Sequence, residues 1–430
     1  MKHLHFGAGH FGLGFVCLLA YLAGLRSVIV NRRSPPLAPK QPGDEINAHR
    51  RNELLQASNY YAVRYLLAPH MLKLPNIKRF DLPEFERFVF LEDIVGDIGF
   101  TQRYVVPESL LITTSLASEE PYPIVARVAL NIAIERKKAR IQKPCYIVAC
   151  ENKQNTRNIE DAIRHEIAER DAFPQLDELN IVPLEASVDR VCVSIMETES
   201  TVQIDAEPFA RLFLQSSAHD QELRERFSSI SSVVFFTEDI EIEKKKKYWI
   251  LNGAHAFVSI NALYFRAAFI DQYLTQDEID TDLEAFGHYS EKYLSLSQRR
   301  LECRQILDEL CDAFECFLQQ SPRGIAYLAK DFTPDKRQVY IDEIIERFSN
   351  THDYVGRVLK TFVKPSHDKL ESLNIFFERT NPKILEPIKL YMKSKNTAPV
   401  AIMQSMLRLF ELIAAGDDID RILAARHSRQ

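Results

Sequence analysis

The N-terminal stretch MKHLHFGAGHFGLGFVCLLAYLAGLRSVIVN (residues 1–31) decides the fold class. KHLHFG (2–7) predicts a short buried strand, and SVIVN (27–31) predicts a second one. Between them, GAGHFGLG (7–14) supplies the glycines of a tight turn, and a helix is predicted from about Phe15 to Ala23. A strand, a glycine turn, a helix and another strand form a βαβ unit, which predicts a parallel sheet.

Three glycines of this turn match the pattern G-x-G-x-x-G: Gly7, Gly9 and Gly12. In a dinucleotide site the first glycine permits the turn, the second lets the backbone approach the pyrophosphate, and the third lets helix and strand pack closely. The helix N-terminus also favours negative charge. The alternatives are a turn without a ligand, or another nucleotide such as a methyl donor. The predicted cofactor-binding residues are Gly7, Gly9, His10, Phe11, Gly12, Asn31, Arg32, Thr114 and Ser115.

The rest of the chain divides into two predicted domains. Up to about residue 240, predicted strands alternate with helices, which favours a doubly wound parallel sheet of the Rossmann type. Beyond a boundary near residues 238–246 the pattern changes to amphipathic helices. We therefore predict a dinucleotide-binding domain (1–240) and an all-helical substrate and catalytic domain (241–430). The predicted elements are a loop at 34–44, helices at 45–56 and 121–138, and strands at 109–116, 144–152 and within 187–205.

Composition excludes several classes of function. Apolar residues make up 46% of the 430 residues, charged residues 27%, and the net charge is −6. This is an ordinary globular mixture that gives no reason to expect nucleic acid or membrane as a partner. A small-molecule partner and a monomer or small homo-oligomer are expected. The cysteines are odd in number and form no CxxC pair, which favours reduced thiols in the cytoplasm.

Residues 11–30 allow one other interpretation. They are almost wholly apolar, so a signal peptide or a membrane span is the alternative to a βαβ unit. The glycines and Arg26 interrupt the run, which favours the βαβ unit.

A second motif, KYWILNGAHAF (247–257), holds Lys247, Asn252 and His255. At about 100° per helical residue they fall at roughly 0°, 140° and 80°, on one face. Lys247 is predicted near a helix N-terminus, where the dipole disfavours a charged ammonium and so favours a general base. The alternatives are a solvated run of lysines (244–247) and a core histidine.

A third motif, ACENKQN (149–155), places Asn152 directly after a predicted strand. Ligands of open α/β sheets bind beyond the carboxyl ends of strands. The alternative is that Glu151 and Asn152 cap the next helix, with Asn155 and Thr156 as rival caps.

Together these motifs resemble the long-chain polyol (mannitol) dehydrogenase family. The resemblance rests on five segments scattered from residue 1 to about residue 357: the opening residues 1–15, ACEN (149–152), VDR (188–190), the lysine–asparagine–histidine spacing of residues 247–256, and RFSN (347–350). It implies a metal-independent, nicotinamide-dependent oxidoreductase that interconverts a hexitol, or its phosphate, and a ketose. Mannitol 1-phosphate and fructose 6-phosphate are the expected pair.

The resemblance also implies roles for single residues. Lys247 would be the general base, Asn152 and Asn252 would polarise the reacting oxygen, and His255 would orient the substrate or the lysine. A phosphate or carboxylate would be held by Arg347, Asn350, Arg357 and Lys360, because guanidinium groups suit anions. Polar helix-surface residues are the alternative for each of these four.

The chain departs from the family where the cofactor form is chosen. Asn31 stands where an acidic residue usually contacts the adenosine ribose, and Arg32 and Arg33 follow it. Loss of an anion and gain of cations favour NADP over NAD. The loop after residue 114 also lacks an expected glycine or proline. The alternative functions are a hexuronate reductase of the fructuronate or tagaturonate type, and a nucleotide-binding protein that has lost catalysis.

Overall fold

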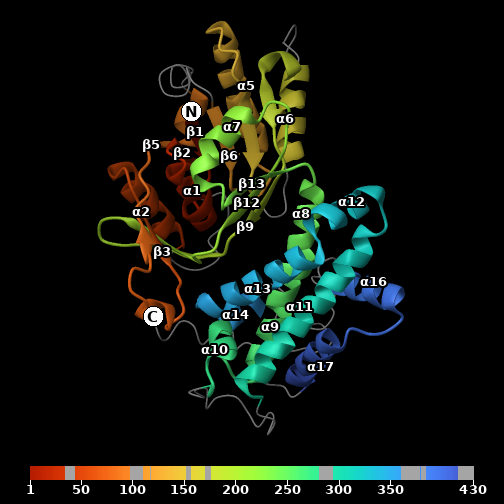
Figure 1. Cartoon of the computed structure of the whole chain (residues 1–430). Coiled ribbons are helices and arrows are strands. Elements are labelled where there is room, and N and C mark those ends of the chain that lie inside the picture. The colour runs from red at the N-terminus through yellow and green to blue at the C-terminus, as the bar shows by residue number, and fades with distance from the viewer. Residues whose placement is uncertain are drawn as a thin grey trace. The chain divides into compact units, whose positions relative to one another are not determined.

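The computed structural model describes residues 1–33, 44–96, 110–116, 118–151, 156–169, 176–279, 294–359, 378 and 384–414. The chain forms two compact units, which Figure 1 shows as a mixed α/β part and a helical part. Unit 1 comprises Met1–Tyr65 and Lys78–Ile240, and unit 2 comprises Leu66–Ile77 and Glu241–Gln430.

The segment Leu66–Ile77 joins unit 2, although the sequence places it within the N-terminal domain. Leu67 forms an antiparallel bridge with Thr351. The amide of Ala68 donates to the carbonyl of Asn350 at 2.8 Å. These contacts cross more than 280 positions of sequence, so local patterns do not reveal them.

Unit 1 is built on a six-stranded sheet in the order β5-β2-β1-β6-β7-β8. Every neighbouring pair is parallel, which confirms the predicted doubly wound fold. The strand order reverses at β1, and ligands of such sheets bind beyond the carboxyl ends of the strands at this point. The strands are β1 (Lys2–Phe6), β2 (Arg26–Asn31), β5 (Arg87–Phe90), β6 (Leu110–Thr114), β7 (Cys145–Ala149) and β8 (Ile181–Pro183).

Helices cover both faces of this sheet (Figure 1). One face packs on α5 (Tyr122–Lys138) and α6 (Thr156–Ala168) through residues such as Leu4 and Ile112. The other face packs on the helix that follows the glycine turn, through residues such as Leu111 and Tyr146. The part of unit 1 that the structure describes also contains the α-helices α2 (Asp44–Ala57), α3 (Leu91–Gly96) and α7 (Gln221–Arg226).

The helix after the glycine turn begins earlier than predicted. It is helical from His10 onward, and the amide of Leu13 donates to the carbonyl of Gly9 at 3.0 Å. It comprises a π-helical segment, η1 (Gly12–Cys17), and α1 (Leu18–Leu22). The predicted start at Phe15 is wrong because Gly12 and Gly14 lie inside the helix, where their missing side chains allow close packing.

Two smaller sheets complete unit 1. One has the order β10-β11-β3-β4 and the other β13-β12-β9. The strand-like stretch 187–205 therefore contributes to both. The strands are β3 (Ala62–Tyr65), β4 (Phe80–Asp81), β9 (Ala186–Asp189), β10 (Cys192–Glu197), β11 (Val202–Ala206), β12 (Arg211–Gln215) and β13 (Val234–Thr237).

Unit 2 is helical in its described residues. Its core surrounds the continuous stretch of η6 (Lys247–Leu251) and α9 (Asn252–Tyr264), where Trp249, Phe257 and Ile260 are almost fully buried. None of the helices among the described residues is long and apolar enough to cross a membrane. The helices are α8 (Ile240–Lys246), η6 (Lys247–Leu251), α9 (Asn252–Tyr264), α10 (Ile270–Thr275), α11 (Leu296–Leu318), α12 (Pro322–Asp331), α13 (Pro334–Asn350), α14 (Val355–Leu359), α16 (Glu386–Lys395) and α17 (Val400–Ala414).

Candidate functional site

Each glycine of the turn between β1 and the first helix has its own physical reason. Gly7 ends β1 with φ +112°, a conformation that side chains disfavour. A Cβ on Gly12 would lie 2.3 Å from the carbonyl oxygen of Gly7 and 2.3 Å from Oγ of Ser115. A Cβ on Gly9 would meet nothing within 4 Å, so this glycine faces open space where a ligand can approach. These are the three roles that the motif predicts.

The residues at the carboxyl end of β2 contact several neighbouring side chains. Nδ2 of Asn31 donates to Oδ1 of Asn52 at 2.9 Å, and Nδ2 of Asn52 donates to the carbonyl of Arg32 at 3.1 Å. Arg32 lies 3.7 Å from the exposed carboxylate of Glu120. Arg33 pairs with Asp93 at 2.5 Å. Both arginines thus have acidic neighbours, which reduces the positive charge available to a 2′-phosphate.

The predicted residues after β6 lie beside the glycine turn. Thr114 is fully buried at the end of the strand. The amide of Ser115 donates to the carbonyl of Phe6 at 2.9 Å, and its hydroxyl donates to the carbonyl of Gly7 at 3.2 Å. His10 is exposed in the first turn of the helix, and Phe11 packs against Phe15 with ring centroids 5.2 Å apart.

The sequence analysis considered Glu151 only as a helix cap. In the structure its side chain connects the residues after β7 to the residues after β6. Its Oε1 accepts a hydrogen bond from the amide of Leu116 at 2.8 Å, and burial raises the pKa of its carboxyl group. At the start of α6, the Thr156 hydroxyl accepts from the amide of Ala149 at 3.0 Å. Asn152 and Asn155 lie outside the described residues.

Lys247 lies within a long helix and not near its N-terminus. α8, η6 and α9 follow one another without a break, and Lys246 has helical φ and ψ of −55° and −51°. The predicted position near a helix N-terminus is therefore wrong, and so is the dipole argument for a neutral amine. The stretch from Ile240 contains no proline or glycine that would begin the helix at Lys247.

The π-helical segment changes the angle around the helix axis between Lys247 and Asn252. The amide of Asn252 donates to the carbonyl of Lys247, an i→i+5 bond. Asn252 therefore lies one wide turn above Lys247, on nearly the same side of the helix. The predicted separation of about 140° assumed regular α-helical spacing and is wrong. Single π turns inside α-helices occur frequently at functional sites.

The three lysines before Lys247 form ion pairs. Lys244 pairs with Glu241 at 2.9 Å, and Lys245 pairs with Glu386 at 3.3 Å. Lys246 is mostly buried and pairs with Glu243 at 2.6 Å. Its Nζ also donates to the Tyr327 hydroxyl at 2.8 Å. The run is thus not a uniformly solvated face.

His255 belongs to a buried charged cluster that the sequence analysis missed. Its Nε2 lies 2.9 Å from Oδ2 of Asp353, and its ring stacks on Phe348 at 5.0 Å between centroids. Nε of Arg357 donates to Oδ1 of Asp353 at 2.8 Å. Burial opposes ionisation of Asp353, but Arg357 and His255 outweigh it and hold the pKa of this carboxyl group well below its usual range. The i, i+4 spacing of Asp353 and Arg357 was the one available signal.

The predicted anion-binding residues have different surroundings. Arg357 is engaged with Asp353. Asn350 ends α13 with Oδ1 3.1 Å from Nε2 of His70, and Arg347 is buried in the last turn of the same helix. Lys360 lies outside the described residues.

The Asp353 cluster predicts a pH-dependent stability. The pKa of Asp353 is depressed in the folded chain, so its ionised form contributes stability above the ordinary aspartate pKa of about 3.9. This contribution is lost as pH falls through the folded pKa. Asp353→Asn should therefore unfold at lower urea concentration than the unmodified chain at neutral pH, and the two midpoints should converge below about pH 4. Equal midpoints at neutral pH would show that the ion pairs contribute no net stability.

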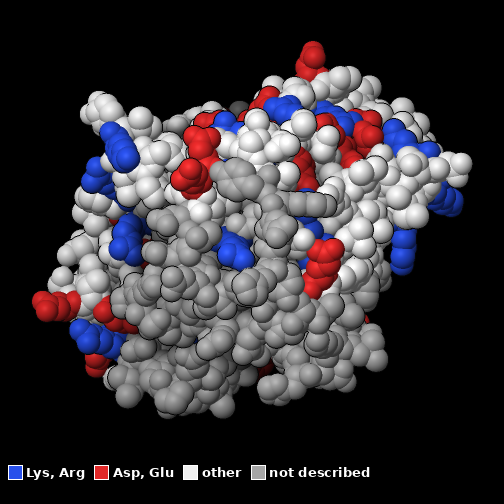
Figure 2. Space-filling model, turned by 90° about the horizontal axis from the view of Figure 1, so that it is seen from below, with Lys and Arg blue, Asp and Glu red and all other residues white. Residues whose placement is uncertain are grey.

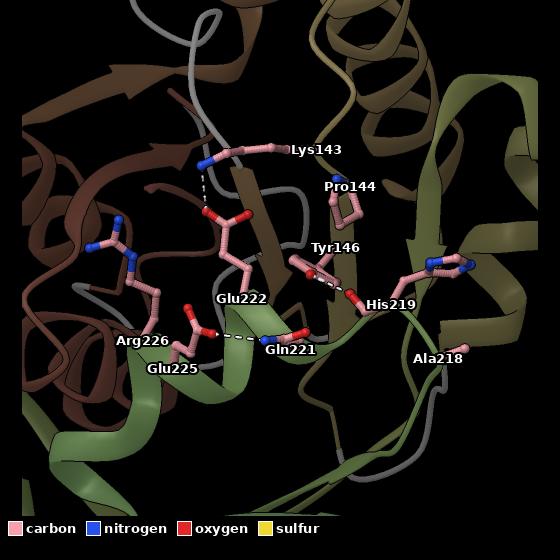
Figure 3. Close-up of a pocket in the computed structure, with 9 residues that line it drawn as sticks. All are labelled: Lys143, Pro144, Tyr146, Ala218, His219, Gln221, Glu222, Glu225 and Arg226. Atoms are coloured by element: carbon pink, nitrogen blue, oxygen red, sulfur yellow. Dashed lines mark hydrogen bonds and ion pairs between the residues drawn. The ribbon is translucent and has the colours of Figure 1, made fainter.

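One hollow in unit 1 lies away from the glycine turn. It has a volume of about 650 Å³ and is lined by Pro144 and Tyr146, at the amino end of β7, and by α7 and the residues before it (Figure 3). Lys143 pairs with Glu222 at 3.2 Å, and Gln221 donates to Glu225 at 3.2 Å. Because dinucleotides bind at the carboxyl edge of such sheets, this hollow is not part of the dinucleotide site.

Charges are mixed on the surface that Figure 2 shows. Lysine and arginine alternate with aspartate and glutamate over its described part. Among the described residues, no three His, Cys, Asp or Glu side chains are grouped as metal ligands would be.

Comparison with known proteins supports the motifs. No protein-family model matches the chain. A mannitol-1-phosphate 5-dehydrogenase of Clostridium acetobutylicum is 24% identical over 314 residues, which cover 72% of this chain and 71% of the relative. The chain is similar to mannitol-1-phosphate 5-dehydrogenases. One from Lactococcus lactis is 24% identical over 366 residues, which cover 84% of this chain and 78% of the relative. The resemblance inferred from the motifs is thus confirmed.

A solved structure confirms the two-unit architecture. D-sorbitol dehydrogenase in its substrate-free form matches with a TM-score of 0.53 at 13% sequence identity. The match covers 98% of this chain and 94% of that one. At this identity the likeness establishes the fold alone.

Proposed function

We propose that this chain is a nicotinamide-dependent oxidoreductase that interconverts a hexitol phosphate and a ketose phosphate without a metal. The observation that carries the proposal is the π turn in which the amide of Asn252 donates to the carbonyl of Lys247, with His255 held by Asp353 three residues after Asn252. The names of the similar proteins, mannitol-1-phosphate 5-dehydrogenases, supply the substrate class.

The residues of the catalytic helix supply proton transfer and orientation. Lys247 takes the proton from the substrate hydroxyl during oxidation and returns it during reduction. The amide of Asn252 donates a hydrogen bond to the reacting oxygen, which stabilises the negative charge that develops on it. His255, held through Nε2, orients the substrate. A nicotinamide, when bound, would supply the acceptor for the hydride of the carbinol carbon.

Residues of unit 1 hold the dinucleotide. The pyrophosphate would approach the open side of Gly9, and the amides at the start of the helix would donate to it. Asn31 lies at the end of the second strand, where the adenosine ribose is expected.

A panel of ketoses tests this function. The purified chain should oxidise NADH or NADPH when fructose 6-phosphate is added, and it should act more slowly on free fructose and on a keto-acid sugar. Activity should persist after prolonged treatment with a strong chelator. A preference for the keto-acid would support a hexuronate reductase instead. No turnover with any ketose, despite dinucleotide binding, would favour a chain that has lost catalysis.

The cofactor form is the finer part of the proposal. We expect NADPH to be used at least as well as NADH, since Asn31 carries no charge to repel a 2′-phosphate. Asn31→Asp with Arg32→Ala should shift the kcat/KM ratio toward NADH by about tenfold, or about 1.4 kcal/mol. Arg33→Ala is the matched control, because this guanidinium lies over Phe90 and pairs with Asp93. A strict preference of the unmodified chain for NADH would contradict the expectation.

A further inference from the structure

A chain of buried polar side chains crosses the middle of the parallel sheet. His3 and His5, both on β1, are fully buried. Nδ1 of His3 lies 2.7 Å from the hydroxyl of Ser27 on β2, and its Nε2 lies 2.7 Å from the hydroxyl of Thr113 on β6. The same Thr113 hydroxyl lies 2.7 Å from Nδ1 of His5. Nε2 of His5 lies 3.0 Å from the hydroxyl of Ser115.

The hydrogen bond from Ser115 to the Gly7 carbonyl gives this chain a direction. With the Ser115 hydroxyl donating to the carbonyl of Gly7, its oxygen accepts from Nε2 of His5. Nδ1 of His5 then accepts from Thr113, which in turn accepts from Nε2 of His3. Nδ1 of His3 is left to accept from Ser27. The chain therefore runs from Ser27 to the Gly7 carbonyl without a break.

In this arrangement both imidazoles are neutral. Burial holds both rings in the neutral form: it lowers the pKa of His5 to about 3 and lowers that of His3 well below 6.5. Each imidazole then donates one hydrogen bond and accepts another.

The far end of the chain packs directly behind the glycine turn. A Cβ on Gly12 would lie 2.5 Å from Nε2 of His5 and 2.3 Å from Oγ of Ser115. The imidazole of His5 thus lies directly against the glycine turn. Apolar side chains of similar shape would fill this core at little or no cost in stability. A polar chain that ends at the Gly7 carbonyl therefore indicates that the position of this carbonyl matters.

We propose that the chain Ser27–His3–Thr113–His5–Ser115 positions the Gly7 carbonyl, and with it the glycine turn, for binding of the dinucleotide pyrophosphate. This inference rests on the proposed function, because it assigns the chain to the cofactor site. His3 and His5 are positioning residues, since neither touches the open side of the turn.

Ser27 offers the sharpest test because it lies at the end of the chain away from the turn. Ser27→Ala removes the donor to His3 and leaves every residue of the turn in place. We expect it to weaken the binding of NADH and NADPH by about five- to tenfold, as for loss of one buried hydrogen bond. Ser27→Thr keeps the hydroxyl and should bind within about twofold of the unmodified chain. Fluorescence titration with each dinucleotide measures the affinity of both variants.

A matched control separates positioning from simple destabilisation. Ile29→Val removes one methylene from a fully buried residue of the same strand and should lower the urea midpoint without weakening dinucleotide binding. The kcat of Ser27→Ala at saturating cofactor should be unchanged, since Lys247 belongs to unit 2. Equal dinucleotide binding by Ser27→Ala and the unmodified chain would overturn the proposal, as would equal weakening by Ile29→Val.

Hydrogen exchange keeps this inference distinguishable from the proposed function. Amide exchange of residues 7–13, measured without ligand, should accelerate in Ser27→Ala but not in Ser27→Thr or Ile29→Val. If the unmodified chain bound neither dinucleotide, the proposed function would fail, and exchange would still show whether the chain holds the turn. Unchanged exchange in Ser27→Ala would show that it does not.

Discussion

Lys247→Ala is expected to lower kcat by roughly 10²–10⁴-fold, the usual share of general acid–base catalysis. The physical reason is that Lys247 is the proposed base for the substrate hydroxyl, and the amide of Asn252 cannot replace it because an amide is not a base. Dinucleotide binding should barely change, since the glycine turn belongs to the other unit. Steady-state kinetics and fluorescence titration measure the two effects.

The matched control is Lys244→Ala, three positions earlier in the same run of lysines. Lys244 pairs with Glu241 at the surface, and exposed ion pairs contribute little to stability. Its loss should leave kcat within about twofold, and added primary amines should partly restore Lys247→Ala alone. Near-normal turnover by Lys247→Ala, or an equal loss in both variants, would favour the alternative of a solvated run of lysines (244–247).

Replacing Gly9 or Gly12 by alanine should weaken dinucleotide binding in both cases, but only the change at Gly12 should lower the stability of the chain. Gly12→Ala forces a methyl group to within 2.3 Å of the Gly7 carbonyl, so the turn must move. Such overpacking typically costs about 1–3 kcal/mol of stability, and dinucleotide binding should be lost with the shape of the turn. Thermal unfolding and fluorescence titration report the two quantities.

Gly9→Ala adds its methyl group to open space and should leave the thermal midpoint unchanged. Dinucleotide binding should nevertheless weaken by about tenfold or more, because the methyl group occupies the side on which the pyrophosphate approaches. Unweakened binding by Gly9→Ala would mean that the ligand does not approach the turn from this side. A stable, binding-competent Gly12→Ala would contradict the packing described for Gly12.

The sheet could be predicted because its signals are local. β1, the glycine turn and β2 follow within 31 residues, and buried parallel strands are recognisable as apolar runs. The start of the first helix was wrong for a reason within the same stretch. Glycine usually marks a helix boundary, yet Gly12 and Gly14 are inside the helix because neighbouring atoms occupy the space of a side chain.

The helix that contains Lys247 and Asn252 shows the limit of an argument from helical periodicity. A period of 3.6 residues separates Lys247 and Asn252 by about 140° on one face, and nothing in the pattern predicts the i→i+5 bond between their backbones. Asp353 was missed because its partner His255 lies 98 positions away, and only the tertiary fold brings them together. The same holds for His3, whose role depends on Thr113 of a non-consecutive strand.

Transfer of isotope from the cofactor tests the central claim most directly. Reduced nicotinamide cofactor carrying deuterium at the transferable position should be incubated with the chain and fructose 6-phosphate, and the hexitol phosphate analysed by mass spectrometry and NMR. The account predicts one deuterium per product molecule, on the carbon that was the carbonyl, and none with Lys247→Ala over the same time. Oxidation of the cofactor without deuterated product, or no reaction with any ketose phosphate, would contradict it.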